Sequence, residues 1–152
     1  MSLLVWEEAI EERLALGGPG AGGVQIPGLG SDCVHVEAVP DEVPMPRDQR
    51  QVKPYVCIWY GQRIRGNDGY RGLCGVRGNA YRANLLVLVC AHVGTVQRGV
   101  VAQVSDLLHG FRPAGQGELE ESSSTTIRRP LDISGVRGRI AVPVAYSGTV
   151  DL

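Results

Sequence analysis

The most informative stretch of this 152-residue chain is Tyr81–Phe111, which reads YRANLLVLVCAHVGTVQRGVVAQVSDLLHGF. Its first part contains an unbroken aliphatic run, Leu85–Val89, and such a run predicts a strand that is covered on both faces. Its second part repeats valine and leucine at helical spacing from Val96 to about His109, and Gly110 ends the pattern. A buried strand feeding an amphipathic helix is therefore the expected centre of one small domain, with no enzymatic role.

The sequence also predicts an N-terminal helix and several strands around this unit. A helix is expected from its cap, Ser2, to about Leu16, because apolar residues recur there at helical spacing; the set is Leu3, Trp6, Ile10 and Leu14. Strands are expected at Cys33–Val39, Tyr55–Tyr60, Arg82–Ala91 and Arg139–Ser147. Pro143 has no N–H group to donate to a ladder, so it favours an edge strand or a bulge.

These elements predict an α+β domain with two helices packed on a mostly antiparallel sheet. The length fits a single domain covering residues 1–152. The 21 glycines and nine prolines predict long irregular segments, and 17–51 and 61–79 are expected to be extended loops.

Composition argues against several classes of protein. The formal net charge is −1, which does not favour binding to nucleic acid or to membrane surfaces. No apolar run approaches the roughly 18 residues that a membrane-spanning helix needs. Glutamates stand near the N-terminus where a signal peptide would carry positive charge, so a cytoplasmic protein is expected. The four cysteines are widely spaced, which favours buried thiols over a disulfide or a metal site.

No motif for catalysis or cofactor binding is convincing. The glycine run at 17–23 lacks the preceding strand and the Gly-Lys-Ser/Thr ending of a phosphate loop, so a flexible linker is expected. Cys90 and His92 share one face of the predicted strand, but a metal site needs three or four convergent ligands. There is no G-x-S-x-G elbow, and nothing supplies a base for Cys74. We therefore expect no enzyme, no cofactor and no metal.

The distribution of charge along the chain is more informative. Residues 1–48 carry nine acidic residues against Arg13 and Arg47, whereas 49–82 carries seven basic residues against Asp68 alone. A solvated surface is the simpler interpretation, since exposed ion pairs contribute only about 0–1 kcal/mol. The alternative is a molecule with an acidic side and a basic side, which can associate head to tail and close into a ring.

The second half of the chain resembles the tail terminator (tail completion) proteins of long-tailed, non-contractile phages, particularly those of actinobacteria. The resemblance covers roughly 55–152 and lies in the pattern and order of its segments. These are Val76–Asn84 leading into Leu85–Cys90, Gln103–Leu108, Gly110–Pro113, Gly117–Leu119, Val142–Tyr146 and Val150–Leu152. The long Gly/Pro segment at 17–51 departs from the compact form of the family.

The resemblance implies a homohexameric ring in the virion, at the head-proximal end of the tail, assembled in the host cytoplasm. Such a ring binds the last tail-tube subunits, stops tube growth and offers a surface to the head–tail connector proteins. Genome DNA passes through its lumen without specific binding, and no cofactor or membrane is involved. The residues expected to contact a neighbouring subunit or the tube are Arg63, Arg65, Tyr70, Arg71, Arg77 and Pro143. The acidic residues expected to complement them are Glu7, Glu11, Asp41 and Glu42.

Two other functions remain open from the sequence. A head-side neck or connector protein has a similar size and also forms rings. A small nucleic-acid-binding domain would use the basic segment, with Tyr70 and Tyr81 stacking on bases.

Overall fold

The computed structural model describes residues 2–42, 52–61, 64–65, 80–92, 95–122, 131–132 and 139–151. Over these residues the chain forms two α-helices, two 3-10 turns, a seven-stranded sheet and a separate two-stranded hairpin. The α+β class predicted from the sequence is therefore confirmed.

The helices are α1 (Leu3–Leu16) and α2 (Thr95–Leu108), and the 3-10 turns are η1 (Ser31–Cys33) and η2 (Pro113–Gly115). The strands are β1 (Gly17–Pro19), β2 (Gln25–Pro27), β3 (Val34–Val36), β4 (Tyr55–Tyr60), β5 (Ile64–Arg65), β6 (Ala80–His92), β7 (Glu120–Glu121), β8 (Leu131–Asp132) and β9 (Arg139–Asp151).

The large sheet is built around one long pair of strands. β6 and β9 are each 13 residues long and pair antiparallel without a break, from Ala80 opposite Asp151 to His92 opposite Arg139. The strand order is β3-β4-β6-β9-β7, with β5 also pairing β6 and β8 also pairing β9. β3 runs parallel to β4 and all the other pairs are antiparallel, so the expectation of a mostly antiparallel sheet is confirmed.

Helix α1 forms as its apolar periodicity predicts. Trp6, Ile10 and Leu14 are buried on the side that faces the sheet. Ser2 occupies the N-cap position, but its side chain makes no capping hydrogen bond. Gly17 ends the helix with φ of 81°, a left-handed value at which a side chain would be strained.

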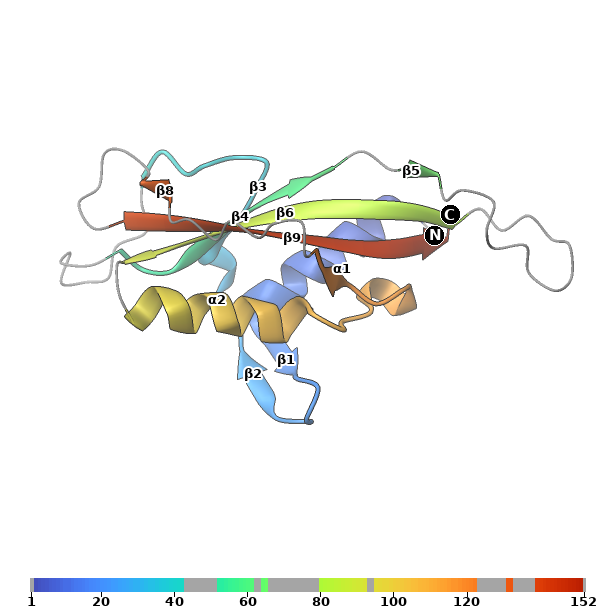
Figure 1. Ribbon diagram of the computed structural model, residues 1–152, viewed down its shortest axis with the longest axis horizontal. Helices are drawn as coiled ribbons and strands as arrows, with labels where there is room; N and C mark the ends of the chain where they lie inside the picture. The colour runs from blue at the N-terminus through green and yellow to red at the C-terminus, as the bar shows by residue number, and fades with distance from the viewer. Residues whose placement is uncertain are drawn as a thin grey trace, which may run out of the picture.

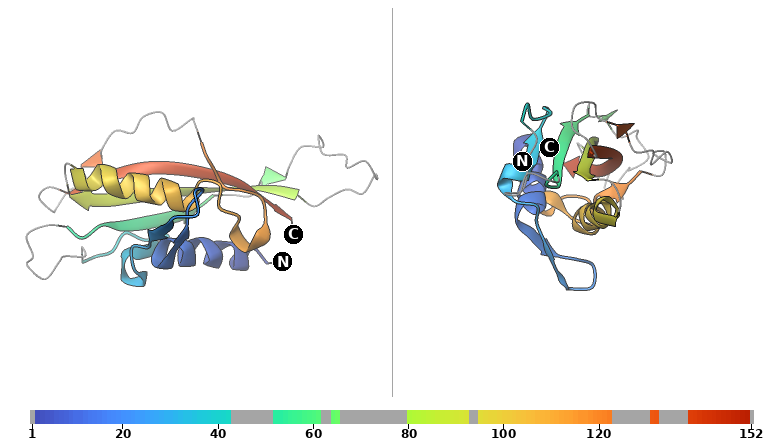
Figure 2. Two further views of the ribbon diagram at one scale, coloured as in Figure 1. Left: turned by 90° about the horizontal axis from the view of Figure 1, so that it is seen from below. Right: turned by 90° about the vertical axis from the view of Figure 1, so that its left-hand side faces the viewer.

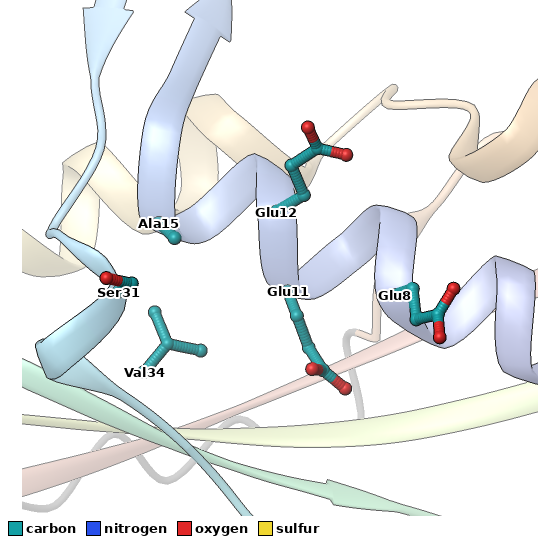
Figure 3. A pocket seen from close by; sticks show the side chains of 6 residues that line it. All are labelled: Glu8, Glu11, Glu12, Ala15, Ser31 and Val34. Atoms are coloured by element: carbon teal, nitrogen blue, oxygen red, sulfur yellow. The ribbon is translucent and has the colours of Figure 1, made fainter.

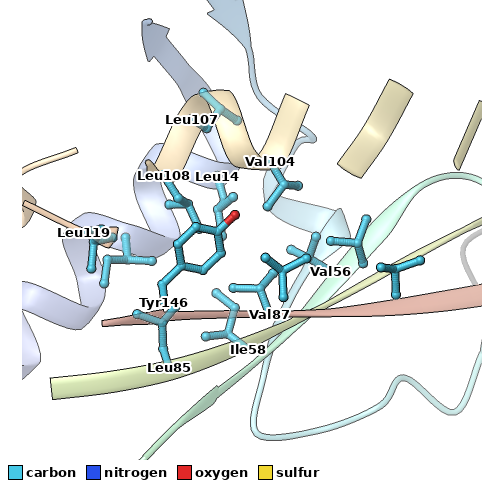
Figure 4. Close-up of a cluster of buried hydrophobic side chains, with 14 of the residues drawn as sticks. Leu14, Val56, Ile58, Leu85, Val87, Val104, Leu107, Leu108, Leu119 and Tyr146 are labelled. Atoms are coloured by element: carbon cyan, nitrogen blue, oxygen red, sulfur yellow. The ribbon is translucent and has the colours of Figure 1, made fainter. Parts of the chain in front are cut away.

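Helix α2 begins at Thr95 and ends one residue before its predicted limit. Its apolar face is buried at Val100, Val104, Leu107 and Leu108. Gly110 follows with φ of 75° and terminates the helix, as predicted. Both helices lie on the same side of the sheet (Figures 1 and 2), where their apolar faces meet in one core around Tyr146 (Figure 4).

The two faces of the sheet are therefore covered unequally. On the helix side, Val87 and Val89 are fully buried. On the opposite side, Leu86 is 37% exposed, although its neighbours in sequence are buried. The prediction that Leu85–Val89 is covered on both faces is wrong at Leu86, because no helix among the described residues packs on that side (Figure 1).

The expectation of an extended loop at 17–51 is wrong at 17–27. Residues 17–27 form the β1–β2 hairpin, in which Gly17 pairs with Pro27 and Pro19 with Gln25. The strand expected at Cys33–Val39 is shorter, because η1 takes its first residue and Glu37, with φ of 51°, ends β3. In the second expected loop, 61–79, residues 64–65 form β5, and 62–63 and 66–79 lie outside the described residues.

Candidate interaction surfaces

Most of the predicted contact residues lie outside the described part of the chain. These are Arg63, Tyr70, Arg71 and Arg77. Arg65 is placed by its backbone alone, on β5 opposite Tyr81 of β6. Of the predicted contact set, only Pro143 has a described side chain; it is half-buried on β9, opposite Leu88.

The prediction of an edge strand or a bulge at Pro143 is wrong for β9 as a whole. β9 lies between β6 and β7 and keeps an unbroken register against β6. On the side away from β6, the Ala145 carbonyl accepts a hydrogen bond from the Ser122 N–H (2.8 Å). Because backbone groups alternate in direction along a strand, the Pro143 nitrogen points to that same side.

The position of Pro143 explains why the sheet tolerates a proline there. On the side away from β6, β7 pairs with β9 at 146–147 and β8 pairs with it at 140–141. Among the described residues, no strand stands opposite Pro143 on that side, so its missing N–H breaks no described ladder bond.

Two basic residues of the segment 49–82 have partners within the chain. Lys53 forms an ion pair with Asp32 (Nζ to Oδ2, 2.9 Å), and this hydrogen bond, together with the positive charge of Lys53, lowers the pKa of that carboxyl. Arg82 donates from Nη2 to the Ser147 hydroxyl (3.0 Å) while its side chain remains exposed. Arg82 therefore presents its charge to solvent beside the sheet.

The predicted acidic complement lies on α1 and in the segment after β3. Glu7 and Glu11 are half-buried on α1, whereas Asp41 and Glu42 are exposed. The Tyr60 hydroxyl donates to the Glu7 carbonyl and to Glu11 Oε1, both at 3.2 Å. Burial, followed by the nearby charge of Glu11, raises the pKa of Tyr60 well above its ordinary value. Tyr60 thus holds the Glu11 side chain against the sheet.

A shallow pocket of about 330 Å³ lies beside these acids, between α1 and the chain around η1. Its lining residues are Glu8, Glu11, Glu12, Ala15, Ser31 and Val34 (Figure 3). Ionised carboxylates only accept hydrogen bonds, so this side of α1 favours cationic groups such as guanidinium. Among the described residues, no three His, Cys, Asp or Glu side chains are grouped to hold a metal ion.

The sheet face away from the helices is the second candidate surface, and we call it the outer sheet face. It is made of alternate residues of the three central strands: Tyr55, Cys57 and Trp59 of β4, Leu86, Leu88 and Cys90 of β6, and Ala141, Pro143 and Ala145 of β9. One end of it is covered, because Cys33 and Val52 pack with Tyr55 and Cys90 into a small buried cluster.

The other end of the outer sheet face is incompletely covered. The register places Trp59 opposite Leu86 and Leu86 opposite Ala145, and we call these three residues the apolar row. Leu86 is 37% exposed, and Trp59 and Ala145 are half-buried. The sequence did not identify the row because its members come from three separate strands. The small residues Ala141, Pro143 and Ala145 on one side of β9 were the available signal.

Three thiols are buried, as the sequence predicts for Cys57 and Cys90. Cys33, Cys57 and Cys90 are all fully buried. Burial is the main cause of a raised pKa at the Cys33 thiol, which makes its thiolate less accessible.

Within the described residues, neither helix is long and apolar enough to span a membrane. No protein-family model matches the chain, and no curated protein is significantly similar to it. The resemblance to tail terminators therefore rests on the sequence segments quoted above.

Proposed function

We propose that this chain is a structural virion protein that forms a ring, caps the phage tail tube, stops its polymerisation and provides the head–tail joining surface. The ring is a homohexamer at the head-proximal end of the tail, and genome DNA passes through it. The mechanism is steric: a ring seated on the last tube subunits covers the surface on which the next subunit would dock. The chain has no enzymatic role and uses no cofactor.

The observation that carries this proposal is the difference between the two sides of the molecule. The helix side presents the acidic residues of α1, and the outer sheet face presents the apolar row with Arg82 nearby. A subunit of a closed ring needs two unlike surfaces that face away from each other, because each copy contacts its two neighbours differently. The sequence resemblance supplies the identity of the ring and of its partner, the tail tube.

Mass measurement by light scattering tests the proposal, on the chain alone and with the tail-tube protein of the same phage. We expect a ring of several copies, or a monomer that assembles into one on the tube. Electron micrographs should show the ring at the tube end, and tubes grown in its presence should be shorter. A strict monomer that leaves tube growth unchanged would contradict the proposal.

Binding measurements with two other partners separate the alternatives left open by the sequence. A neck or connector protein would bind the head's portal assembly and leave the tube uncapped. A nucleic-acid-binding domain would bind single-stranded DNA with an affinity that falls steeply as salt is added.

A further inference from the structure

The β1–β2 hairpin stands away from the body of the molecule on the helix side. Figures 1 and 2 show it projecting beyond the two helices, in the direction opposite to the outer sheet face. It continues directly from α1, and its tip is the turn 20–24, closed by a hydrogen bond from the Gly20 N–H to the Val24 carbonyl (2.8 Å).

Side chains from both helices hold the base of this hairpin in place. Arg13 of α1 donates from Nε to the Leu107 carbonyl of α2 (3.0 Å) and from Nη2 to the Pro19 carbonyl of β1 (2.5 Å). Gln103 of α2 donates to the Pro27 carbonyl of β2 (2.6 Å). The hairpin is therefore an arm with a fixed base, because both of its strands are tied to the helical layer.

The arm is uncharged and exposes apolar side chains. No charged residue occurs between Arg13 and Asp32. Val24 at the tip is 72% exposed, and Leu16 at the base is 67% exposed. A single exposed apolar residue is common on protein surfaces, so this exposure by itself does not define a contact.

Gly22 lies at the same tip and bears on how closely another surface could approach it. A Cβ atom added at Gly22 would meet nothing within 4 Å, and its φ lies outside the left-handed region. Neither space nor backbone geometry within the chain requires glycine there, whereas Gly17 is required on both grounds. The absence of a side chain at Gly22 leaves the tip open to close approach by another surface.

The outer sheet face provides a matching surface on the opposite side of the molecule. The apolar row is uncharged, so an uncharged tip could dock on it without burying an unpaired charge. The surroundings are complementary in charge, because the arm follows the acidic helix α1 and the row lies near the exposed Arg82. The arm of one molecule points away from its own row, so only a second copy can bring the two together.

We infer that the β1–β2 arm of one subunit docks with Val24 on the apolar row (Trp59, Leu86 and Ala145) of the next subunit. The contact is heterologous, since a different surface is used by each partner, and it propagates from copy to copy until the ring closes. This inference rests on the ring proposed above and assigns the surfaces that join its subunits.

Paired cysteines test the contact directly. In a Cys74→Ser background, Val24→Cys and Leu86→Cys are introduced together, and the assembled protein is oxidised. We expect a ladder of disulfide-linked multimers on a denaturing gel, ending at the copy number of the ring. A mixture of the two single variants should give disulfide-linked dimers only. Each single variant alone should give no disulfide-linked multimers.

Charge at the arm tip provides the second test, with a matched control. Val24→Asp should lower the assembled mass to that of a monomer, because the carboxylate would be buried on the apolar row. Val39→Asp places the same charge at another exposed valine, 45% exposed, and should leave assembly unchanged. Circular dichroism and thermal unfolding establish that both variants are folded.

The outcomes separate this inference from the proposed function. A ring that forms normally with Val24→Asp, and gives no ladder with the paired cysteines, would overturn the arm contact and leave tail capping standing. A ladder that grows without limit, with no effect on tail tubes, would support the contact and contradict the capping ring.

Discussion

The helix-side face and the outer face of the sheet differ in how completely the chain covers them. Val87 and Leu86 are neighbours on β6, yet Val87 is fully buried and Leu86 is 37% exposed. The helix-side face is sealed by α1 and α2 (Figure 4), which bring Leu14, Val104 and Leu107 onto it. The comparison indicates that the helix-side face is fully covered, whereas the outer face is buried at one end and partly exposed at Leu86.

The largest expected effect is a loss of stability from a substitution on the helix-side face. Leu107→Ala should lower the free energy of unfolding by about 2–5 kcal/mol, because it opens a cavity between α2 and the sheet. Leu86→Ala is the matched substitution on the outer face and should cost about 1 kcal/mol or less, since its side chain is already partly in water. Urea denaturation of the monomeric protein measures both. Equal costs would remove the distinction between the faces.

The second prediction concerns the hairpin that leaves the helix side. Gly17→Ala should destabilise the protein by about 2 kcal/mol or more, because φ is +81° and the new Cβ would lie 2.1 Å from the Ile26 carbonyl oxygen. Gly22→Ala at the tip should be neutral, or stabilising by about 0.4–1 kcal/mol, as the unfolded chain loses freedom. Thermal unfolding of both variants provides the measurement. A costly Gly22→Ala would show that the tip glycine serves the monomer.

The third prediction concerns Arg13, which ties α1, α2 and β1 together and lies 4.9 Å from the centre of the Phe111 ring. Arg13→Met should lower stability by about 1–2 kcal/mol and speed hydrogen exchange in the hairpin. Arg112→Met is the control, because it removes an exposed ion pair with Glu118 and should change stability by less than about 0.5 kcal/mol. Unchanged exchange at the hairpin in Arg13→Met would contradict its role as an anchor.

The smallest expected effect is a change in the pH dependence of stability, and it distinguishes two neighbouring aromatic residues of β4. The pKa of Tyr60 on the helix side is raised in the folded state, so its contribution to stability is complete below the unfolded-state pKa near 10. That contribution is lost as the pH rises above about 10, because the unfolded chain then releases the tyrosine proton more readily. Tyr60→Phe should therefore flatten the fall in stability above pH 10. Trp59→Phe, on the outer face, removes no titrating group and should leave the slope unchanged.

Sequence periodicity was sufficient wherever an element has one apolar side facing one layer. α1 and β4 begin and end where their patterns predict, and α2 begins and ends one residue earlier than predicted. The burial of Trp6, Ile10 and Leu14 follows from their spacing alone. Such elements can be predicted because buried positions recur at a fixed spacing along a helix or a strand.

Periodicity did not predict the elements whose structure depends on contacts between residues far apart in the sequence. The hairpin at 17–27 is rich in glycine and has no alternating pattern, so nothing local distinguishes it from a linker. Its base is held by Arg13 and Gln103, which lie on different helices, and sequence spacing does not show that these side chains converge. The apolar row was missed for the same reason, as its three residues come from three strands.

From the amino-acid sequence alone, the Tyr81–Phe111 unit is predictable as a scaffold: a long apolar strand, a helix with one apolar face, and a glycine that terminates the helix. The sequence also determined the separation of acidic and basic residues along the chain. That both helices cover one face of the sheet follows from the tertiary structure alone, because an unbroken aliphatic run does not indicate which face of its strand a helix will cover. This arrangement leaves Leu86 partly in water and directs the hairpin away from it.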